Sequence, residues 1–118
     1  MGYYTIMDAI NLAESLIDAE LFEEARSLLR DSILVARRTL GTDHELTIDL
    51  RSNYALAISR DTNSSRDDVH EAVAILEDVV RTARRVFGLQ HPYVAAYRRF
   101  LENARMRLAD DESRAADA

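Results

Sequence analysis

The chain has 118 residues and a formal net charge of −6 at pH 7, and every one of its 15 basic residues is arginine. It contains three glycines and one proline, which disfavours turn-rich sandwiches and barrels, and no cysteine, which excludes disulfides, thiolate metal sites and cysteine nucleophiles. The negative charge argues against a general nucleic-acid or anionic-membrane binder, whereas an apolar content of 47% is enough for the core of one domain.

Apolar residues recur at spacings of three and four along almost the whole chain, which is typical of helices that bury one face. In the first segment, Ile6, Ile10, Ala13 and Ile17 follow this spacing. The pattern predicts five helices and no strands, over residues 4–19, 22–40, 45–60, 66–87 and 92–109. Residues 110–118 are acidic and small and lack an apolar stripe, so we expect an acidic, disordered tail.

Helix start and stop signals agree with this division. Gly41 and Gly88 each follow an arginine-rich turn and are expected to end a helix in a left-handed conformation. Ser65 is a candidate N-cap, and Pro92 suits the first position of a helix. Residues 61–65 form the longest expected loop.

Internal repeats relate the two halves of the chain. At an offset of 47 residues, Gly41 aligns with Gly88 and His44 with His91. At an offset of 42 residues, the preceding helices align as Ile6 with Ile48, Asn11 with Asn53, and Ala13 with Ala55. The difference between the two offsets places an insertion in the 61–65 loop, and the chain is therefore built from a repeated helix pair.

The repeated motifs resemble the 42-residue tetratricopeptide repeat of kinesin light chains. The resemblance rests on Asn11-Leu12-Ala13, on Leu21-Phe22-Glu23-Glu24-Ala25, on the run from Ala36 to His44, and on Gly88-Leu89-Gln90-His91-Pro92. It implies an all-α fold, a right-handed α-solenoid of antiparallel helix pairs, with about two and a half repeats over residues 1–109.

Small and charged residues indicate how the helix pairs stack. Alanines at repeated positions allow close helix approach: Ala13, Ala25, Ala36, Ala55, Ala72 and Ala83. In the fifth helix, Glu102 takes the position of Ala13 and Ala55, and a carboxylate buried without a countercharge is costly. We therefore expect the fifth helix to act as a C-terminal cap.

Three histidines are the main candidates for chemistry, and none lies at metal-ligand spacing from another. His44 and His91 occupy equivalent turns, which favours a structural role, and His70 lies in a charged first turn. There is no phosphate-binding loop or nucleophile elbow, so we expect no catalytic residue, cofactor or metal.

Two arginine pairs are open to two interpretations. Arg37-Arg38 and Arg84-Arg85 can bind oxyanions, although their place at helix ends favours a dipole and solubility role. Because acidic residues are mixed with them throughout, we expect neither nucleic acid nor membrane as a partner.

The resemblance also implies a concave groove, lined by the first helix of each pair, that takes a protein or peptide. The groove positions would be Met7, Asn11, Glu14 and Asp18, then Asp49, Ser52, Asn53, Leu56 and Arg60, and finally Arg99, Phe100, Asn103 and Arg107. Asn11 and Asn53 match the asparagine that holds a peptide backbone in related repeats, and a hydrogen bond between stacked helices is an equal alternative. Asp49 stands where the chaperone-binding branch has a basic residue, which disfavours a clamp for a chaperone tail.

These observations lead to a hypothesis about function. The chain is predicted to be a non-catalytic adaptor or scaffold that binds a peptide or a helix in its groove. The alternative is a self-association module that forms homo-oligomers, in the simplest case a homodimer, through its exposed end faces. No segment resembles a membrane helix or a signal peptide, so we expect a cytoplasmic protein.

Overall fold

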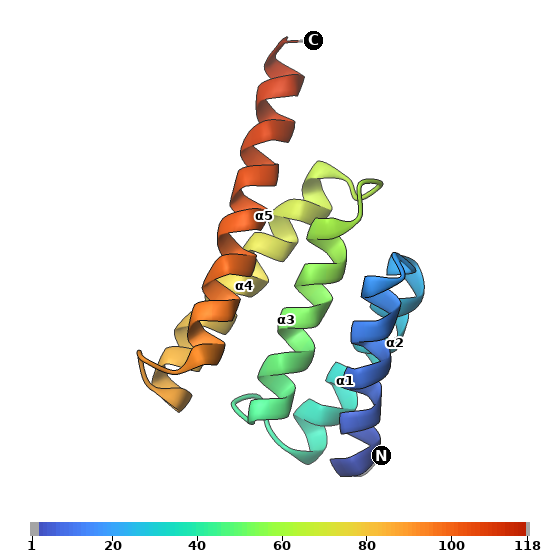
Figure 1. The fold of residues 1–118 in the computed structure, drawn as a ribbon, viewed down its shortest axis with the longest axis vertical. Coiled ribbons are helices and arrows are strands. Elements are labelled where there is room, and N and C mark those ends of the chain that lie inside the picture. The colour runs from blue at the N-terminus through green and yellow to red at the C-terminus, as the bar shows by residue number, and fades with distance from the viewer. Residues whose placement is uncertain (1–2, 118) are drawn as a thin grey trace.

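Five α-helices make up residues 3–117, the part of the chain that the computed structural model describes (Figure 1). They are α1 (Tyr3–Asp18), α2 (Phe22–Thr39), α3 (Glu45–Arg60), α4 (Arg66–Phe87) and α5 (Pro92–Asp117). These residues contain no strand, so the predicted all-α class is confirmed. The predicted limits of the first four helices are correct to within one residue.

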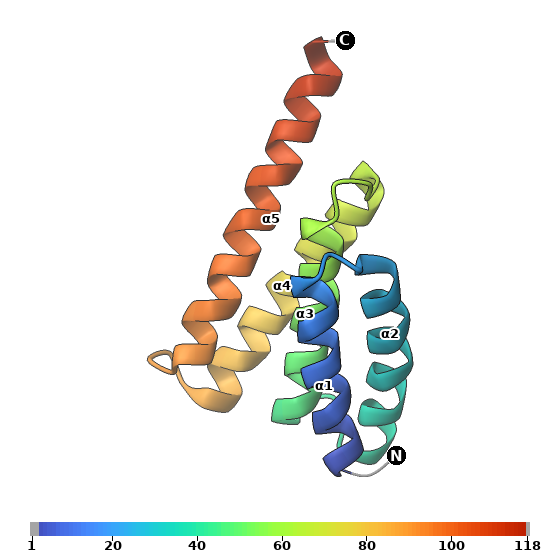
Figure 2. The ribbon, with the colours of Figure 1, turned by 45° about the vertical axis from the view of Figure 1, so that its right-hand side comes forward.

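The helices form two layers. α1, α3 and α5 lie side by side on the face shown in Figure 1, and α2 and α4 lie behind them, as the turned view in Figure 2 also shows. Within the described residues, each helix contacts its neighbours in sequence, α3 also contacts α1 and α5, and α2 does not touch α4. Contact between near neighbours alone is typical of a stack of helical repeats. The right-handedness of the stack stays a prediction.

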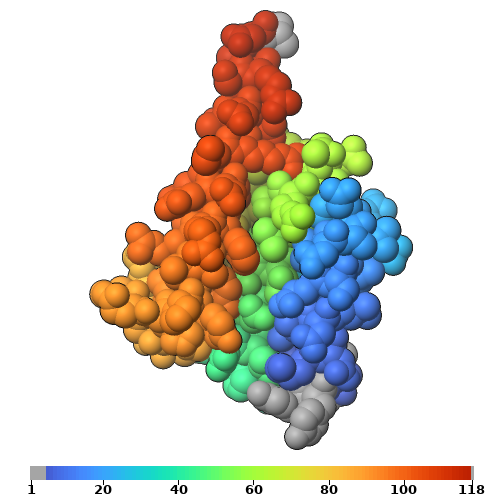
Figure 3. Space-filling model, in the orientation of Figure 1, coloured from blue at the N-terminus to red at the C-terminus, as the bar shows by residue number. Residues whose placement is uncertain are grey.

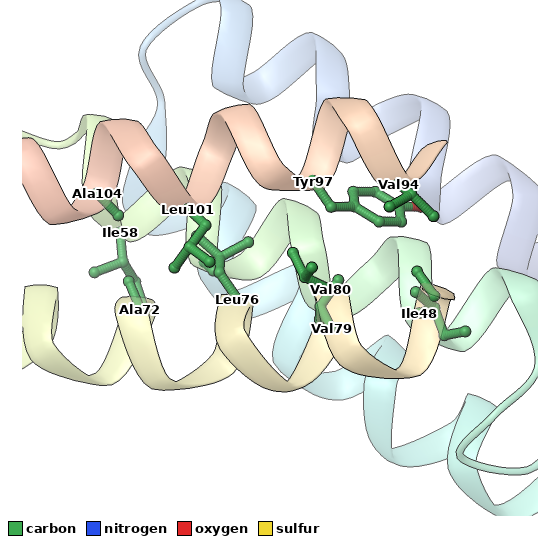
Figure 4. Packing of buried hydrophobic residues seen from close by; sticks show 12 residues of the cluster. Ile48, Ile58, Ala72, Leu76, Val79, Val80, Val94, Tyr97, Leu101 and Ala104 are labelled. Carbon is green, nitrogen blue, oxygen red and sulfur yellow. The ribbon is translucent and has the colours of Figure 1, made fainter. Parts of the chain in front are cut away.

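The middle helix, α3, is buried on two faces and belongs to two apolar clusters. Leu46 and Leu50 pack with α1 and α2 in the first cluster, and Ile48 packs with α4 and α5 in the second. Figure 4 shows the second cluster, in which Leu101 of α5 points toward Leu76 of α4. All six repeated alanines, Ala13, Ala25, Ala36, Ala55, Ala72 and Ala83, are fully buried, as their spacing predicted.

The helix signals read from the sequence are found at the expected places. Gly41 and Gly88 have φ values of 93° and 90°, in the region that favours glycine. The Ser65 hydroxyl accepts from the backbone N–H of Asp68, and the Asp68 carboxylate accepts from the backbone N–H of Ser65, which forms a capping box. α5 begins at Pro92. These predictions are confirmed.

The two histidine turns have the same structure. The Nδ1 atoms of His44 and His91 accept hydrogen bonds from the backbone N–H groups of Leu46 and Tyr93, each at 3.1 Å. Each ring therefore caps the helix that follows its turn. The structural role expected for both histidines is confirmed.

The expected disordered tail is corrected by the structure, in which α5 continues to Asp117; Ala118 lies outside the described residues. Asp111 lies 3.6 Å from Arg107 and 3.8 Å from Arg114, within one helical turn on either side. Such pairs and the alanine content favour a helix without any apolar stripe. In Figure 1 the last turns of α5 project beyond the other helices.

Candidate functional site

The face formed by α1, α3 and α5 carries the predicted groove. In Figure 3 α3 is set back, so that only a narrow strip of it is visible between α1 and α5. Where α3 and α5 begin, the groove deepens into a hollow of about 220 Å³, here called the groove hollow. It is lined by Met7, Ile10, Asn11 and Glu14 of α1, Glu45, Leu46 and Asp49 of α3, and Tyr93 of α5. The structure thus brings together four of the predicted groove positions, Met7, Asn11, Glu14 and Asp49.

Asp49 joins α3 to α5 beneath the groove. The buried Tyr97 hydroxyl donates a hydrogen bond to Asp49 Oδ1 at 3.0 Å. Burial raises the pKa of Asp49 above its ordinary value; the bond from Tyr97 opposes this effect and the nearby Glu45 adds to it. Burial and the Asp49 carboxylate also raise the pKa of Tyr97, so its hydroxyl stays protonated and keeps donating.

Negative charge gathers at the groove hollow. Burial raises the pKa of Glu14, and the carboxylates of Asp49 and Asp18 raise it further. Repulsion between carboxylates is relieved when a cation lies between them. The groove hollow is therefore suited to a positively charged group.

Asn53 lies away from this hollow. It is only 5% exposed, and its Nδ2 donates to the backbone oxygen of Asp49 on its own helix at 3.1 Å. The neighbouring Ser52 is fully buried and donates to the same oxygen. The hydrogen bond of Asn53 thus stays within α3 and does not join two stacked helices, while its contact with a peptide stays a prediction. Asn11 is exposed in the groove hollow.

Arg107 has a different role from the one predicted. Its Nη1 donates to the backbone oxygens of Ser59 and Asp61 at 2.7 and 2.5 Å, and its Nη2 donates to that of Ser64 at 3.2 Å. These carbonyls end α3 or belong to the inserted loop, where helix geometry leaves them without partners. Arg107 holds the loop in place and is no cation for a partner, which corrects its assignment to the groove.

The other predicted groove residues are dispersed. Leu56 and Phe100 are partly buried and pack against the first and second apolar clusters, respectively. Arg60 is exposed and lies 4.0 Å from Asp18. Arg99 and Asn103 are exposed on α5 and do not line the groove hollow.

Metal-ligating side chains, His70 and the apolarity of the helices bear on other possible functions. Within residues 3–117, no three metal-ligating side chains come together. His70 of α4 contacts Glu112 of α5 at 3.3 Å. None of the described helices combines the length and the apolarity needed to cross a membrane.

Comparison with known families adds to this geometry. A family model described as tetratricopeptide repeat matches residues 9–46 and 55–93, well over half of the chain. Comparisons with curated proteins and with solved structures give no match. Each matched block covers the end of one helix, the whole of the next helix and the histidine turn after it. Repeats of this family form a non-catalytic fold that mediates contacts between proteins. The chain therefore belongs to the tetratricopeptide repeat family.

Proposed function

We propose that this chain is a non-catalytic interaction module, of the kinesin light chain-like repeat type, that binds a peptide or a helix in the groove formed by α1, α3 and α5. One observation carries the proposal: residues of all three helices meet around a single hollow of about 220 Å³. Sites between packed elements are where ligands bind most often. The framework of the repeat accounts for the buried residues and leaves the exposed ones around this hollow free for a partner.

The chemistry around the groove hollow favours a peptide that presents a basic side chain next to an apolar one. Glu14, Glu45 and Asp49 supply negative charge, and Tyr93, which is 44% exposed, supplies an aromatic ring. A cation is attracted both by carboxylates and by the face of an aromatic ring. Met7 offers an apolar contact beside them.

The test selects peptides from a random displayed library on the immobilised chain and measures their affinity for variants. The double variant Asn11→Ala with Glu14→Ala removes two exposed side chains of the groove hollow. Asp31→Ala is the control, because Asp31 is exposed on α2 in the other layer. We expect peptides rich in lysine or arginine that lose roughly tenfold in affinity on the double variant and nothing on the control.

Equal binding to wild type and double variant would overturn the groove proposal, and so would selection of acidic peptides only. Sedimentation across a concentration series tests the alternative of self-association. A dimer that the double variant abolishes would assign the groove to a second copy of the chain and would also overturn peptide binding there.

A further inference from the structure

A second hollow, of about 550 Å³, lies in the other layer of the molecule, between α2 and α4 with α3 as its floor. α2 and α4 do not touch within the described residues, which leaves the space between them open. We call it the α2–α4 pocket. It is lined by Arg30, Leu34 and Arg37 of α2, Arg51 and Tyr54 of α3, and Glu71 of α4, among others. It shares no residue with the groove hollow.

The middle of the α2–α4 pocket is apolar. Leu34 is 53% exposed although it lies on the wall of a hollow, and Ile33, Tyr54 and Ile75 line the space around it. Burying such a side chain against a partner removes apolar surface from water and favours binding. The α2–α4 pocket can therefore bind one aliphatic side chain.

Positive charge surrounds this apolar centre. Arg30 and Arg37 are exposed and form no ion pair with any carboxylate of the described residues. Glu71 is the one acidic side chain in the lining. On a chain with a net charge of −6, this is a local excess of cations. An acidic ligand would be attracted to this part of the surface.

The floor carries a third guanidinium, that of Arg51. Its Nη2 contacts Asp78 at 2.8 Å, while its buried Nη1 has no acceptor among the described residues. Burial opposes the ionisation of Asp78, but hydrogen bonds from Arg51 and Arg81 outweigh it and lower the pKa of Asp78. A buried donor without an acceptor is unusual in folded proteins and is costly.

The spacing of the exposed arginines indicates the form of the ligand. Arg30 and Arg37 are seven residues apart on one helix, which separates them by roughly 10 Å along its axis. One small anion cannot bridge that distance. A peptide in the extended polyproline II conformation advances about 3.1 Å per residue and turns once every three residues, so acidic residues three positions apart lie on one side and span it.

We propose that the α2–α4 pocket docks an extended acidic segment of a partner protein, in which aliphatic residues lie between two acidic residues three positions apart. The two carboxylates bind Arg30 and Arg37, and an aliphatic side chain between them packs on Leu34. The repeat-related hollow beside α5 is a natural comparison, because Arg84 and Arg98 stand there in the places of Arg37 and Arg51. In that hollow Arg81 stands in the place of the exposed Leu34, and Glu77 in the place of Arg30.

The probe is a dye-labelled peptide, Gly-Ser-Glu-Leu-Leu-Glu-Ser-Gly, capped at its C-terminus, titrated with the full chain and followed by fluorescence polarisation. We expect saturable binding that weakens roughly tenfold in the double variant Arg30→Gln with Arg37→Gln. Arg84→Gln with Arg98→Gln makes the same change of charge in the related hollow and is expected to leave binding unchanged. Peptides with glutamine for glutamate, or alanine for leucine, are expected to bind more weakly than the probe.

Four outcomes would overturn the proposal: absence of saturable binding, equal loss in both double variants, equal binding of the glutamine peptide, or a dimer of the wild type that Leu34→Asp abolishes. The last result would assign the α2–α4 pocket to a second copy of the chain. The groove variant Asn11→Ala with Glu14→Ala is expected to retain the probe, so failure of this proposal is distinguishable from failure of peptide binding in the groove. Because both substituted arginines are exposed and glutamine is a good helix former, we expect the variants to fold.

Discussion

The α2–α4 pocket and the hollow beside α5 occupy equivalent places in two successive repeats, yet they offer a partner different chemistry. At an offset of 47 residues, Leu34 of the first is replaced by Arg81 in the second, and Arg30 by Glu77. Glu77 is paired internally with Arg105 at 3.1 Å. The first hollow thus has an apolar centre flanked by two unpaired arginines, whereas charged side chains occupy the corresponding positions of Leu34 and Arg30 in the second.

The comparison of the two hollows indicates that buried residues specify the repeat fold, whereas exposed residues specify the surface that a partner meets. Buried alanines and glycine turns recur and fix where each hollow lies, whereas exposed residues at the same positions vary freely. One framework can therefore present several surfaces with separate specificities, which is the usual advantage of a solenoid.

The largest expected difference between the two repeats lies in their loops. The turn after α1 is closed by backbone bonds, with Glu20 at a φ of 62°, whereas the inserted 61–65 loop after α3 depends on Arg107. We expect Arg107→Ala to lower the free energy of unfolding by about 2 to 4 kcal/mol, because it strands several carbonyl groups that a charged donor satisfies. Urea denaturation followed by circular dichroism measures this.

Arg105→Ala is the control for this prediction, since Arg105 forms only an exposed pair with Glu77. Its expected cost is at most about 1 kcal/mol. Equal costs for the two variants would mean that the loop does not need Arg107.

The two glycine turns, unlike the two loops, are expected to contribute equally to stability. A Cβ added at Gly41 or Gly88 meets no atom within 4 Å, so the cost of alanine is conformational. We expect Gly41→Ala and Gly88→Ala each to lower the free energy of unfolding by about 1 to 2 kcal/mol, because both positions have positive φ. Calorimetry on the pair checks this, and a cost at one turn alone would show that the turns are not equivalent.

The smallest expected effect concerns Asp49, whose repeat-related positions hold the uncharged Met7 and Ala96. Asp49→Asn keeps an acceptor for Tyr97 and removes a partly buried charge, so we expect a gain of about 0.5 to 1 kcal/mol at pH 7. The same change is expected to weaken binding of basic peptides in the groove. A loss of stability at pH 7 would contradict the expected cost of this charge.

The pH dependence of this gain follows from the raised pKa of Asp49. The folded state takes up a proton at higher pH than the unfolded state, so the wild type gains stability relative to Asp49→Asn as the pH falls. This stabilisation of the wild type is complete at pH values below the pKa of Asp49 in the unfolded chain. It is lost as the pH rises through the pKa of Asp49 in the folded chain. Denaturation between pH 4 and 7 measures the difference in free energy of unfolding between Asp49→Asn and the wild type, which is expected to narrow as the pH falls. A difference that stays constant with pH would contradict this prediction.

The parts of the fold that depend on local signals could be predicted from the sequence. Helix limits, the Ser65 cap and the two histidine turns follow from neighbouring residues, and the resemblance assigned Asn11, Glu14 and Asp49 to one groove. The roles of Arg107 and Asn53 could not be predicted, because their partners are backbone atoms whose positions depend on packing. The α2–α4 pocket was not predicted, because Arg37 was assigned mainly to the helix end, although the nearby apolar Leu34 was a signal.

The burial of α3 on both faces determines the order in which the helices unfold. Because the two apolar clusters share this helix, neither helix pair can be removed without exposing one of its apolar faces to water. Loss of order can begin at α1 or at the projecting end of α5, while α3 opens only when the whole chain unfolds. α3 is thus the cooperative centre of the chain, and any shortened form must end on a helix with one polar face.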